Sequence, residues 1–132
     1  MKTDLPKATF TKDERLSSKK EIDWLFEEGK SFIAYPLRVV FYILPKEENQ
    51  ENVSILVNVS KRKFKRAVHR NHIKRLIREI YRINKHDLKN KMEQEEKRLI
   101  VAFLYLENTI QAYPEIEKAM KKALNLLIEK QS

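Results

Sequence analysis

The stretch VSILVNVSKRKFKRAVHRNHIKRLIREIYR, Val53–Arg82, joins the two patterns that decide the fold. It begins with strict alternation, so that Val53, Ile55, Val57 and Val59 would share one face of a strand. The residues between them are mostly polar, and we expect their face to border a groove or solvent. After a short connection the pattern changes to that of a basic helix, which gives the strand-to-helix step of an α/β fold.

The predicted helix, from Ala67 to Lys85, has one apolar face and one basic face. At 100° per residue, the core face collects Ile73, Leu76, Ile77, Ile80, Tyr81 and Leu88. The opposite side forms a continuous stripe of Asn71, Lys74, Arg75, Arg78, Arg82 and Lys85, with Arg70 at its edge. Such a helix would be about 28 Å long, and a rigid row of cations on that scale can follow the phosphates of a nucleic acid.

The positive charge of the chain is concentrated in this region. The whole chain carries a net charge of +9, but residues 61–85 hold eleven Lys or Arg and one Glu, and the remaining residues sum to −1. A solvated helix face is the alternative interpretation, but such faces usually mix both signs. The density of one sign therefore indicates a partner that carries phosphate.

The chain before this region predicts a lead-in and a helix. Residues 1–15 have no periodicity, and we expect a flexible N-terminal lead-in there. In the following segment, LSSKKEIDWLFEEGK, Ser18 and Glu21 have the spacing of a capping box. Gly29, the only glycine of the chain, stands where a helix would end.

The other predicted elements complete a small α/β domain over residues 16–132. SFIAYPLRVVFYIL predicts a strand broken near Pro36, RLIVAFLYL a buried strand, and YPEIEKAMKKALNLLIEK a closing helix. We interpret the charged stretch HDLKNKMEQEEK as the end of the basic helix and a loop. The order is α-β-β-α-β-α, which predicts an α/β two-layer sandwich with three to four strands and three helices.

Composition narrows the classes of protein to which the chain can belong. Its 132 residues suit a single domain. We find no apolar run near the ~20 residues of a membrane-spanning helix and no secretory signal at the start. The chain has no cysteine, so we expect no disulfide or thiolate chemistry, and a reducing cytoplasm fits this composition.

Few residues suggest chemistry carried out by the protein itself. A single glycine rules out a glycine-rich phosphate loop. His69 and His72 have a spacing that could bind a metal, but no third ligand of the usual type lies nearby in the sequence. We therefore expect no metal site and no catalytic residue in the chain.

The span from Val59 to Arg82 resembles the signature of the bacterial ribonuclease P protein component. The residues that match are Ser60, Lys61, Ala67, Val68, Arg70, Asn71, Ile73, Lys74, Arg75 and Arg78. Two positions depart from the family pattern: His72 stands where the family usually has Arg, and Lys65-Arg66 stands where Gly-Asn is common. The resemblance implies a mixed sheet with a left-handed βαβ crossover around the basic helix, although right-handed crossovers are the general rule.

The resemblance also implies a function. In this family an RNA subunit with bound Mg²⁺ hydrolyses precursor tRNA at the 5′ end of the mature tRNA, and the protein assists by binding RNA. The RNA subunit would be bound by Arg66, Arg70, Asn71, His72, Lys74, Arg75, Arg78 and Arg82. The 5′ leader of precursor tRNA would lie in a cleft formed by Phe26, Tyr42, Asn58, Ser60, Lys61 and Arg62.

Two other classes of protein could explain the charge. An RNA-binding protein of the ribosomal-protein type accounts for the basic helix but not for the specific motif. A DNA-binding module is disfavoured because no second helix is placed to form a helix-turn-helix. We expect RNA partners, with neither a membrane nor DNA as a target.

Overall fold

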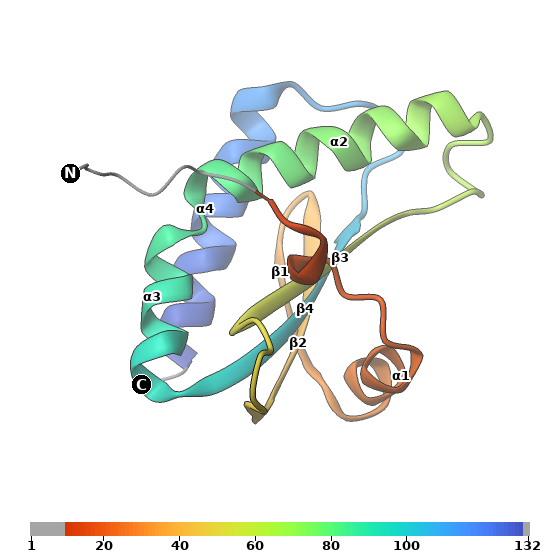
Figure 1. Cartoon of the computed structure of the whole chain (residues 1–132). Coiled ribbons are helices and arrows are strands. Elements are labelled where there is room, and N and C mark those ends of the chain that lie inside the picture. The colour runs from red at the N-terminus through yellow and green to blue at the C-terminus, as the bar shows by residue number, and fades with distance from the viewer. Residues whose placement is uncertain (1–9, 131–132) are drawn as a thin grey trace.

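The computed structural model describes residues 10–130. Its helices and strands, drawn in Figure 1, are a short 3₁₀ turn η1 (Lys12–Glu14), α1 (Lys19–Glu28), β1 (Lys30–Ala34), β2 (Leu37–Pro45), β3 (Val53–Val59), α2 (Ala67–Asn84), α3 (His86–Glu95), β4 (Lys97–Tyr105) and α4 (Tyr113–Lys130). The strand predicted to break near Pro36 does so, and it forms β1 and β2.

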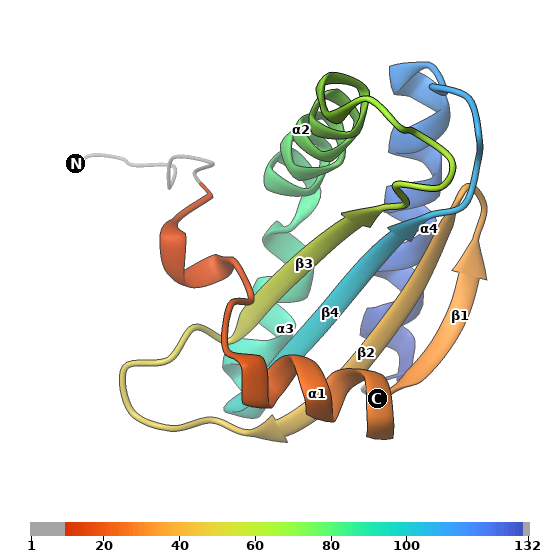
Figure 2. The same cartoon turned by 90° about the vertical axis from the view of Figure 1, so that its right-hand side faces the viewer.

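The four strands form one mixed sheet in the order β1-β2-β4-β3. β2 is antiparallel to both of its neighbours, whereas β3 and β4 are parallel and are joined through α2 and α3. Figure 2 shows α1 in front of the sheet and α2, α3 and α4 behind it, with β4 to the right of the upward-running β3. This is a left-handed crossover, the hand that the family resemblance implied and that folds rarely adopt.

Helices cover both faces of the sheet, so the predicted two-layer arrangement is wrong. On one face α2 and α4 pack beside each other, with α3 against α4 and β4. On the other face α1 packs against β2 and β4 (Figure 2). Because α1 is only ten residues long, it covers one part of this face and leaves the rest of the sheet surface bare.

The sequence did not predict helix α3. Its residues were wrongly assigned to the end of the basic helix and a charged loop. Its apolar stripe consists of Leu88 and Met92, one turn apart and both buried, in an otherwise polar sequence. Lys85, at the junction of α2 and α3, keeps a near-helical backbone with φ −74° and ψ −14°. Two apolar residues in ten are too weak a periodic signal, so the helix depends on packing that the sequence alone does not reveal.

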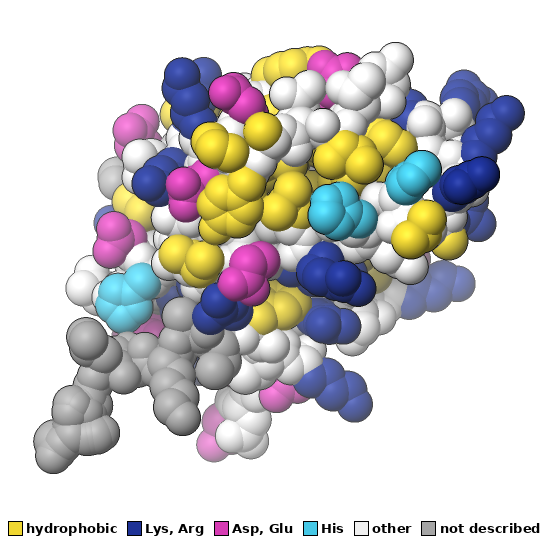
Figure 3. Space-filling view, turned by 90° about the horizontal axis from the view of Figure 1, so that it is seen from above, with side chains coloured by type: hydrophobic (Ala, Val, Ile, Leu, Met, Phe, Trp, Pro, Cys, Tyr) yellow, Lys and Arg dark blue, Asp and Glu magenta, His cyan; other side chains and the backbone are white. Residues whose placement is uncertain are grey.

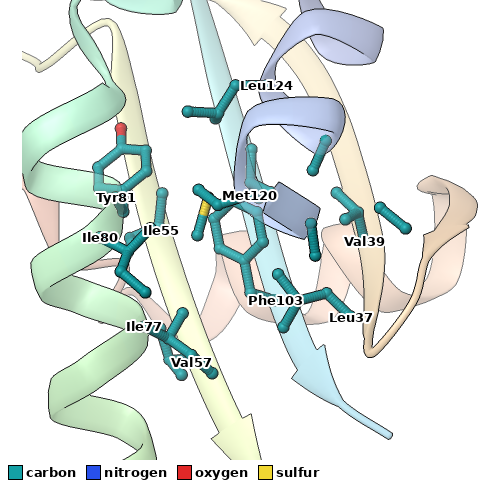
Figure 4. Close-up of a cluster of buried hydrophobic side chains, with 14 of the residues drawn as sticks. Leu37, Val39, Ile55, Val57, Ile77, Ile80, Tyr81, Phe103, Met120 and Leu124 are labelled. Atoms are coloured by element: carbon teal, nitrogen blue, oxygen red, sulfur yellow. The ribbon is translucent and has the colours of Figure 1, made fainter. Parts of the chain in front are cut away.

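The main core lies between the sheet and α2 and α4. Figure 4 shows Ile77, Ile80 and Tyr81 of α2 pointing toward the strands, with Met120 of α4 beside Phe103. The predicted apolar face of β3 is buried here. The closing helix α4 buries apolar side chains at helical spacing: Ile116, Ala119, Met120, Ala123, Leu124 and Leu127. Both alternation and helical periodicity therefore placed the core residues of these elements correctly.

The N-terminal lead-in, predicted to be flexible over residues 1–15, differs from that expectation in the part that the structure describes. Residues 1–9 lie outside the described residues. Arg15 pairs with the edge of β3, and the Leu16 amide donates a hydrogen bond to the Ile55 carbonyl at 2.8 Å. The Glu14 carboxylate is buried and accepts a hydrogen bond from the Lys85 ammonium at 2.5 Å. Residues 10–15 are therefore part of the folded domain.

Gly29 ends α1 as predicted, but not through a left-handed backbone. Its φ of −71° and ψ of 156° are extended. A Cβ atom at this position would lie 2.2 Å from the Leu25 carbonyl oxygen and 2.9 Å from that of Phe41. The glycine is required because the helix end and β2 approach each other too closely for a side chain.

Candidate nucleic-acid interface

The residues predicted to bind an RNA subunit all lie on α2 or at its start. Arg66 is the N-cap residue, and the other seven lie within the helix. The structure leaves all of them exposed or half-exposed, while the opposite face of α2 is buried in the core. Figure 3 shows Lys and Arg side chains crowded at the end where α2 begins, with histidine and apolar side chains along the neighbouring surface.

Four of these side chains surround one hollow. A cavity of about 360 Å³ is lined by Asn71, Arg75, Arg78 and Arg82 of α2, by Glu79, and by Phe10 and Arg15 of the N-terminal segment. Glu79 is the single carboxylate in this lining, and it pairs with Arg82 at 2.5 Å. Burial, and then the positive charge of Arg15, lower the pKa of the Arg78 guanidinium. The crowded cations make the hollow suitable for an anion such as a phosphate.

Arg15 is a residue that sequence reasoning missed. The pattern placed it in a flexible lead-in, but backbone pairing with Ile55 brings it beside α2. Its guanidinium also lies 5.5 Å from the centre of the Phe10 ring. No local signal could have revealed this position, because it depends on a long-range strand contact.

Arg70 has a different position from the rest of the stripe. Its guanidinium donates hydrogen bonds to the carbonyls of Phe64 and Lys65, at 2.7 and 2.9 Å. Phe64 is buried, and it anchors the loop that connects β3 to α2. Arg70 therefore fixes the shape of the loop that carries Lys61 and Arg62.

Two further candidate residues, Lys85 of the predicted stripe and His72 of the predicted RNA-binding set, lie away from the basic hollow. Lys85, assigned to its far end, is buried in the ion pair with Glu14. His72 is exposed, but at 100° per residue it falls on the flank shared with Val68 and Ile83 rather than among the arginines. The family position that usually carries Arg therefore lies outside the basic hollow in this chain.

The bare part of the sheet forms the second candidate surface. The strand register aligns Asn58, Leu104, Arg38 and Ile33 in one row across all four strands. Their side chains share the face on which α1 packs, because residues paired in a sheet point to the same side. Asn58, Arg38 and Ile33 are exposed, and Leu104 is half-buried. Arg38 was not predicted as a site residue, since its neighbours in the sequence gave no functional signal.

α1 forms one wall of this surface. Leu25 is fully buried against the sheet, and Phe26, one residue further along the helix, remains 50% exposed. α1 crosses the sheet from β3 toward β1 (Figure 2), so its right-handed turn directs Phe26 toward the bare rows and Trp24 toward the opposite flank. Phe26 and Asn58 therefore border the same open area.

The loop after β3 supplies the polar edge of the open area. Ser60 accepts a hydrogen bond from the Arg62 amide at 3.1 Å, and the side chains of Lys61 and Arg62 are exposed. The Lys63 ammonium donates to the Leu106 carbonyl, which holds the loop against the end of β4. Four of the predicted leader residues, Asn58, Ser60, Lys61 and Arg62, thus lie at the end of β3 and in the loop after it, while Phe26 lies on α1.

Tyr42 is the predicted leader residue that lies apart. Tyr42 pairs with Ile100 of β4, which in turn pairs with Ser54 of β3. This row lies four residues along the strands from the row that contains Asn58. This offset corresponds to about 13 Å. Tyr42 is half-buried and lines a separate cavity of about 340 Å³ with Glu28, Lys30 and Lys130. The geometry favours Phe26 over Tyr42 as the aromatic contact of the open area.

The described residues contain no group of three His, Cys, Asp or Glu side chains that could hold a metal ion. Within the same part of the chain, no helix is long and apolar enough to cross a membrane.

Comparison with known proteins identifies the family. The family model described as Ribonuclease P matches residues 10–127. The ribonuclease P protein component of Porphyromonas gingivalis strain ATCC 33277 is 44% identical over 119 residues, which cover 89% of this chain and 86% of that protein. The corresponding protein of Thermotoga maritima is 39% identical over 77 residues, 58% of this chain and 62% of its own length.

Solved structures agree in fold. The ribonuclease P protein of Staphylococcus aureus superposes with a TM-score of 0.60 at 19% identity, over 86% of this chain and 94% of that structure. That of Thermotoga maritima superposes with a TM-score of 0.57 at 24% identity, over 88% and 96%. The family match over most of the chain and the close relative together show that this chain belongs to the ribonuclease P protein family.

Proposed function

We propose that this chain is the protein subunit of a ribonuclease P that removes the 5′ leader of precursor tRNA in the cytoplasm. The observation that carries the proposal is the presence of two separate RNA-compatible surfaces on one small domain. One is the cationic stripe of α2 with the hollow beside it. The other is the open sheet face between α1 and the loop after β3.

The stripe of α2 is suited to the RNA subunit. Its guanidinium groups can form paired hydrogen bonds with phosphate oxygens, and the helix holds them at fixed spacing. The hollow formed by Arg15, Arg75, Arg78 and Asn71 would accept a backbone phosphate. These contacts position RNA but read no sequence, as expected for binding to a folded RNA.

The open sheet face is suited to a single strand. Phe26 offers an exposed ring for stacking on an unpaired base, and Asn58 offers a neutral donor and acceptor on the sheet face that α1 partly covers. Lys61 and Arg62 border the same area and can neutralise phosphates of the strand. Tyr42 would contribute only if a longer leader passes around α1.

Hydrolysis in this proposal belongs to the RNA subunit, with Mg²⁺ bound to RNA. The residues of this chain hold the substrate and neutralise phosphate repulsion between the two RNA molecules. Less Mg²⁺ is then needed to keep the substrate in place.

Reconstitution with a bacterial ribonuclease P RNA tests the proposal. Cleavage of precursor tRNA would be measured at low Mg²⁺ for the RNA alone and for the RNA with this protein. The protein should restore cleavage at the 5′ end of the mature tRNA under conditions in which the RNA alone is inactive. Absence of any stimulation, while the protein binds the RNA, would refute the proposed function.

A further inference from the structure

Arg98 of β4 is a buried cation that contacts three other segments of the chain. Its guanidinium forms a two-pronged ion pair with Glu21 of α1, at 3.0 and 2.7 Å. The same guanidinium donates to the Ser54 hydroxyl of β3 at 3.0 Å and to the Glu51 carbonyl at 2.7 Å. Arg98, Glu21 and Ser54 are all buried. We call these three side chains the Arg98 clip.

The clip binds the Glu21 carboxylate, which in many helices would instead cap its own helix end. Ser18 caps α1 by accepting a hydrogen bond from the Glu21 amide at 3.3 Å. In a full capping box the Glu21 carboxylate would turn back toward the Ser18 amide. Here the carboxylate binds Arg98 instead, so the start of α1 is tied to the sheet rather than to itself.

The apolar contact under α1 is a cluster separate from the main core. Its buried side chains are Leu16, Leu25, Val40, Ile100 and Ala102, and partly buried apolar side chains surround them. Apolar packing tolerates sliding and rotation of a short helix, whereas a forked ion pair has one favourable geometry. The clip therefore fixes the direction of α1, which carries Phe26 little more than one turn beyond Glu21.

We propose that the Arg98 clip positions α1 so that Phe26 stands over the open sheet face for contact with the unpaired leader. Arg98 is a positioning residue, since it is buried and would act on the leader only through α1. The inference rests on the proposed function, because it assigns a role within the leader surface. A buried ion pair suits this role: replacing it by apolar residues often leaves stability unchanged, while the geometric restraint is lost.

Two variants test the clip. Arg98→Met combined with Glu21→Leu removes both charges, and Arg98→Lys keeps both charges but loses the forked geometry of the guanidinium. The matched control is Lys91→Met with Glu95→Leu, which removes a half-buried ion pair of 3.2 Å on α3 that lies away from α1. Trp24, the only tryptophan of the chain, lies on α1 and reports the position of the helix through its fluorescence in the protein alone.

The second measurement uses the holoenzyme reconstituted with ribonuclease P RNA. It compares the affinities for precursor tRNA with an eight-nucleotide leader and for mature tRNA. The clip variants should change Trp24 emission and lower the precursor-to-mature affinity ratio by about fivefold, a part of one base-stacking contact. The double variant should melt near the wild-type temperature, and the control should change neither readout. If the double variant does not fold, Arg98→Lys carries the same expectation.

The remaining outcomes separate this inference from the proposed function. Unchanged Trp24 emission and an unchanged ratio in the clip variants would overturn the inference. A changed emission with an unchanged ratio would also overturn it, provided that Phe26→Ala lowers the ratio. If Phe26→Ala also leaves the affinity ratio unchanged, the assignment of the open sheet face as the leader-binding surface is wrong. The proposed function then keeps only the α2 surface.

Discussion

At the scale of single residues, the buried pair of Glu14 and Lys85 joins the N-terminal segment to the end of α2. Both side chains are almost fully buried, and the ammonium lies 2.5 Å from the carboxylate. Burial raises the pKa of Glu14, but the hydrogen bonds from Lys85 and from the Thr11 amide outweigh it and hold the pKa below its ordinary value of 4.5. A lowered folded-state pKa means that ionised Glu14 stabilises the fold above that value and loses this effect as the pH falls.

Lys85→Met should destabilise the protein strongly at neutral pH. The change leaves the Glu14 carboxylate buried without its cation, which typically costs about 3–5 kcal/mol. The control Lys91→Met breaks a more exposed pair and should cost no more than about 1 kcal/mol. Urea unfolding at pH 7 measures both variants, and equal stability would show that the Glu14 pair does not hold the segment.

The same pair predicts the response to acid. Wild-type stability should decline as the pH falls below about 4.5, the ordinary value for Glu14, toward its lowered folded-state pKa. Glu14→Gln, which cannot ionise, should show a shallower decline across this window. Thermal melts between pH 3 and pH 7 provide the comparison, and parallel curves for the two proteins would contradict the assignment.

Arg70 restrains the loop between β3 and α2 through hydrogen bonds to its backbone. Arg70→Ala removes the hydrogen bonds to the Phe64 and Lys65 carbonyls and should loosen the loop of residues 60–66. Trypsin should then cut within this Lys- and Arg-rich loop faster than in Lys74→Ala, because Lys74 makes no such contact with the loop carbonyls. Comparable cleavage rates in the two variants, at similar melting temperatures, would show that Arg70 does not restrain the loop.

At the scale of elements, α2 acts as a rigid row of cations. If about six of its cations and their neighbours meet phosphates, log K against log [salt] should have a slope of roughly −4 to −5 for binding to the RNA subunit. Arg75→Ala, at the hollow, should make the slope shallower by about 1. A wild-type slope shallower than about −2 would mean that RNA binds elsewhere.

The sheet and α1 give a second test, which separates two aromatic residues. Phe26→Ala should weaken holoenzyme binding to precursor tRNA by about tenfold, because stacking on one base is worth about 1–3 kcal/mol. Binding to mature tRNA should remain unchanged. Tyr42→Ala should have the smaller effect on precursor tRNA, since Tyr42 lies about 13 Å along the strands from the row of Asn58. The reverse order would place the leader on the other side of α1.

Periodicity predicted the elements whose pattern is strong and local. The alternation of β3 and the periodicity of α2 and α4 correctly identified most of their buried apolar residues. On the opposite faces, Ser54 and Lys85 are buried, although the pattern predicted them to be accessible. α3 was missed because Leu88 and Met92 are its only buried residues. Arg15 reaches its position through strand pairing, and Arg98 through a buried ion pair. Both contacts join distant parts of the chain, so no residue spacing in the sequence predicts them.

At the scale of the whole molecule, the two proposed RNA surfaces meet at the loop between β3 and α2. The left-handed crossover starts at the end of β3, where Asn58 borders the open face, and continues directly into α2. Arg70 and Lys63 hold this loop from its two sides. In the proposed function, this one short segment would set the relative position of the RNA subunit and the leader.

The protein without RNA should not cleave precursor tRNA. In the proposed division of labour, the chain supplies binding groups and the RNA supplies the hydrolytic centre. Incubation of the purified protein with precursor tRNA and Mg²⁺, followed by gel analysis, checks this expectation. Reproducible cleavage by RNA-free protein, lost in an α2 variant such as Arg75→Ala, would assign the chemistry to the chain.

The most direct test of the two-surface account is the affinity of the holoenzyme for precursor tRNA relative to mature tRNA, compared with the same ratio for the RNA subunit alone. The account predicts that the wild-type protein raises this ratio by about tenfold or more for a leader of several nucleotides, since the leader gains at least one stacking contact and several phosphate contacts. A protein that strengthens binding of both tRNAs by the same factor would contradict the account, because the open sheet face would then contribute nothing to substrate recognition.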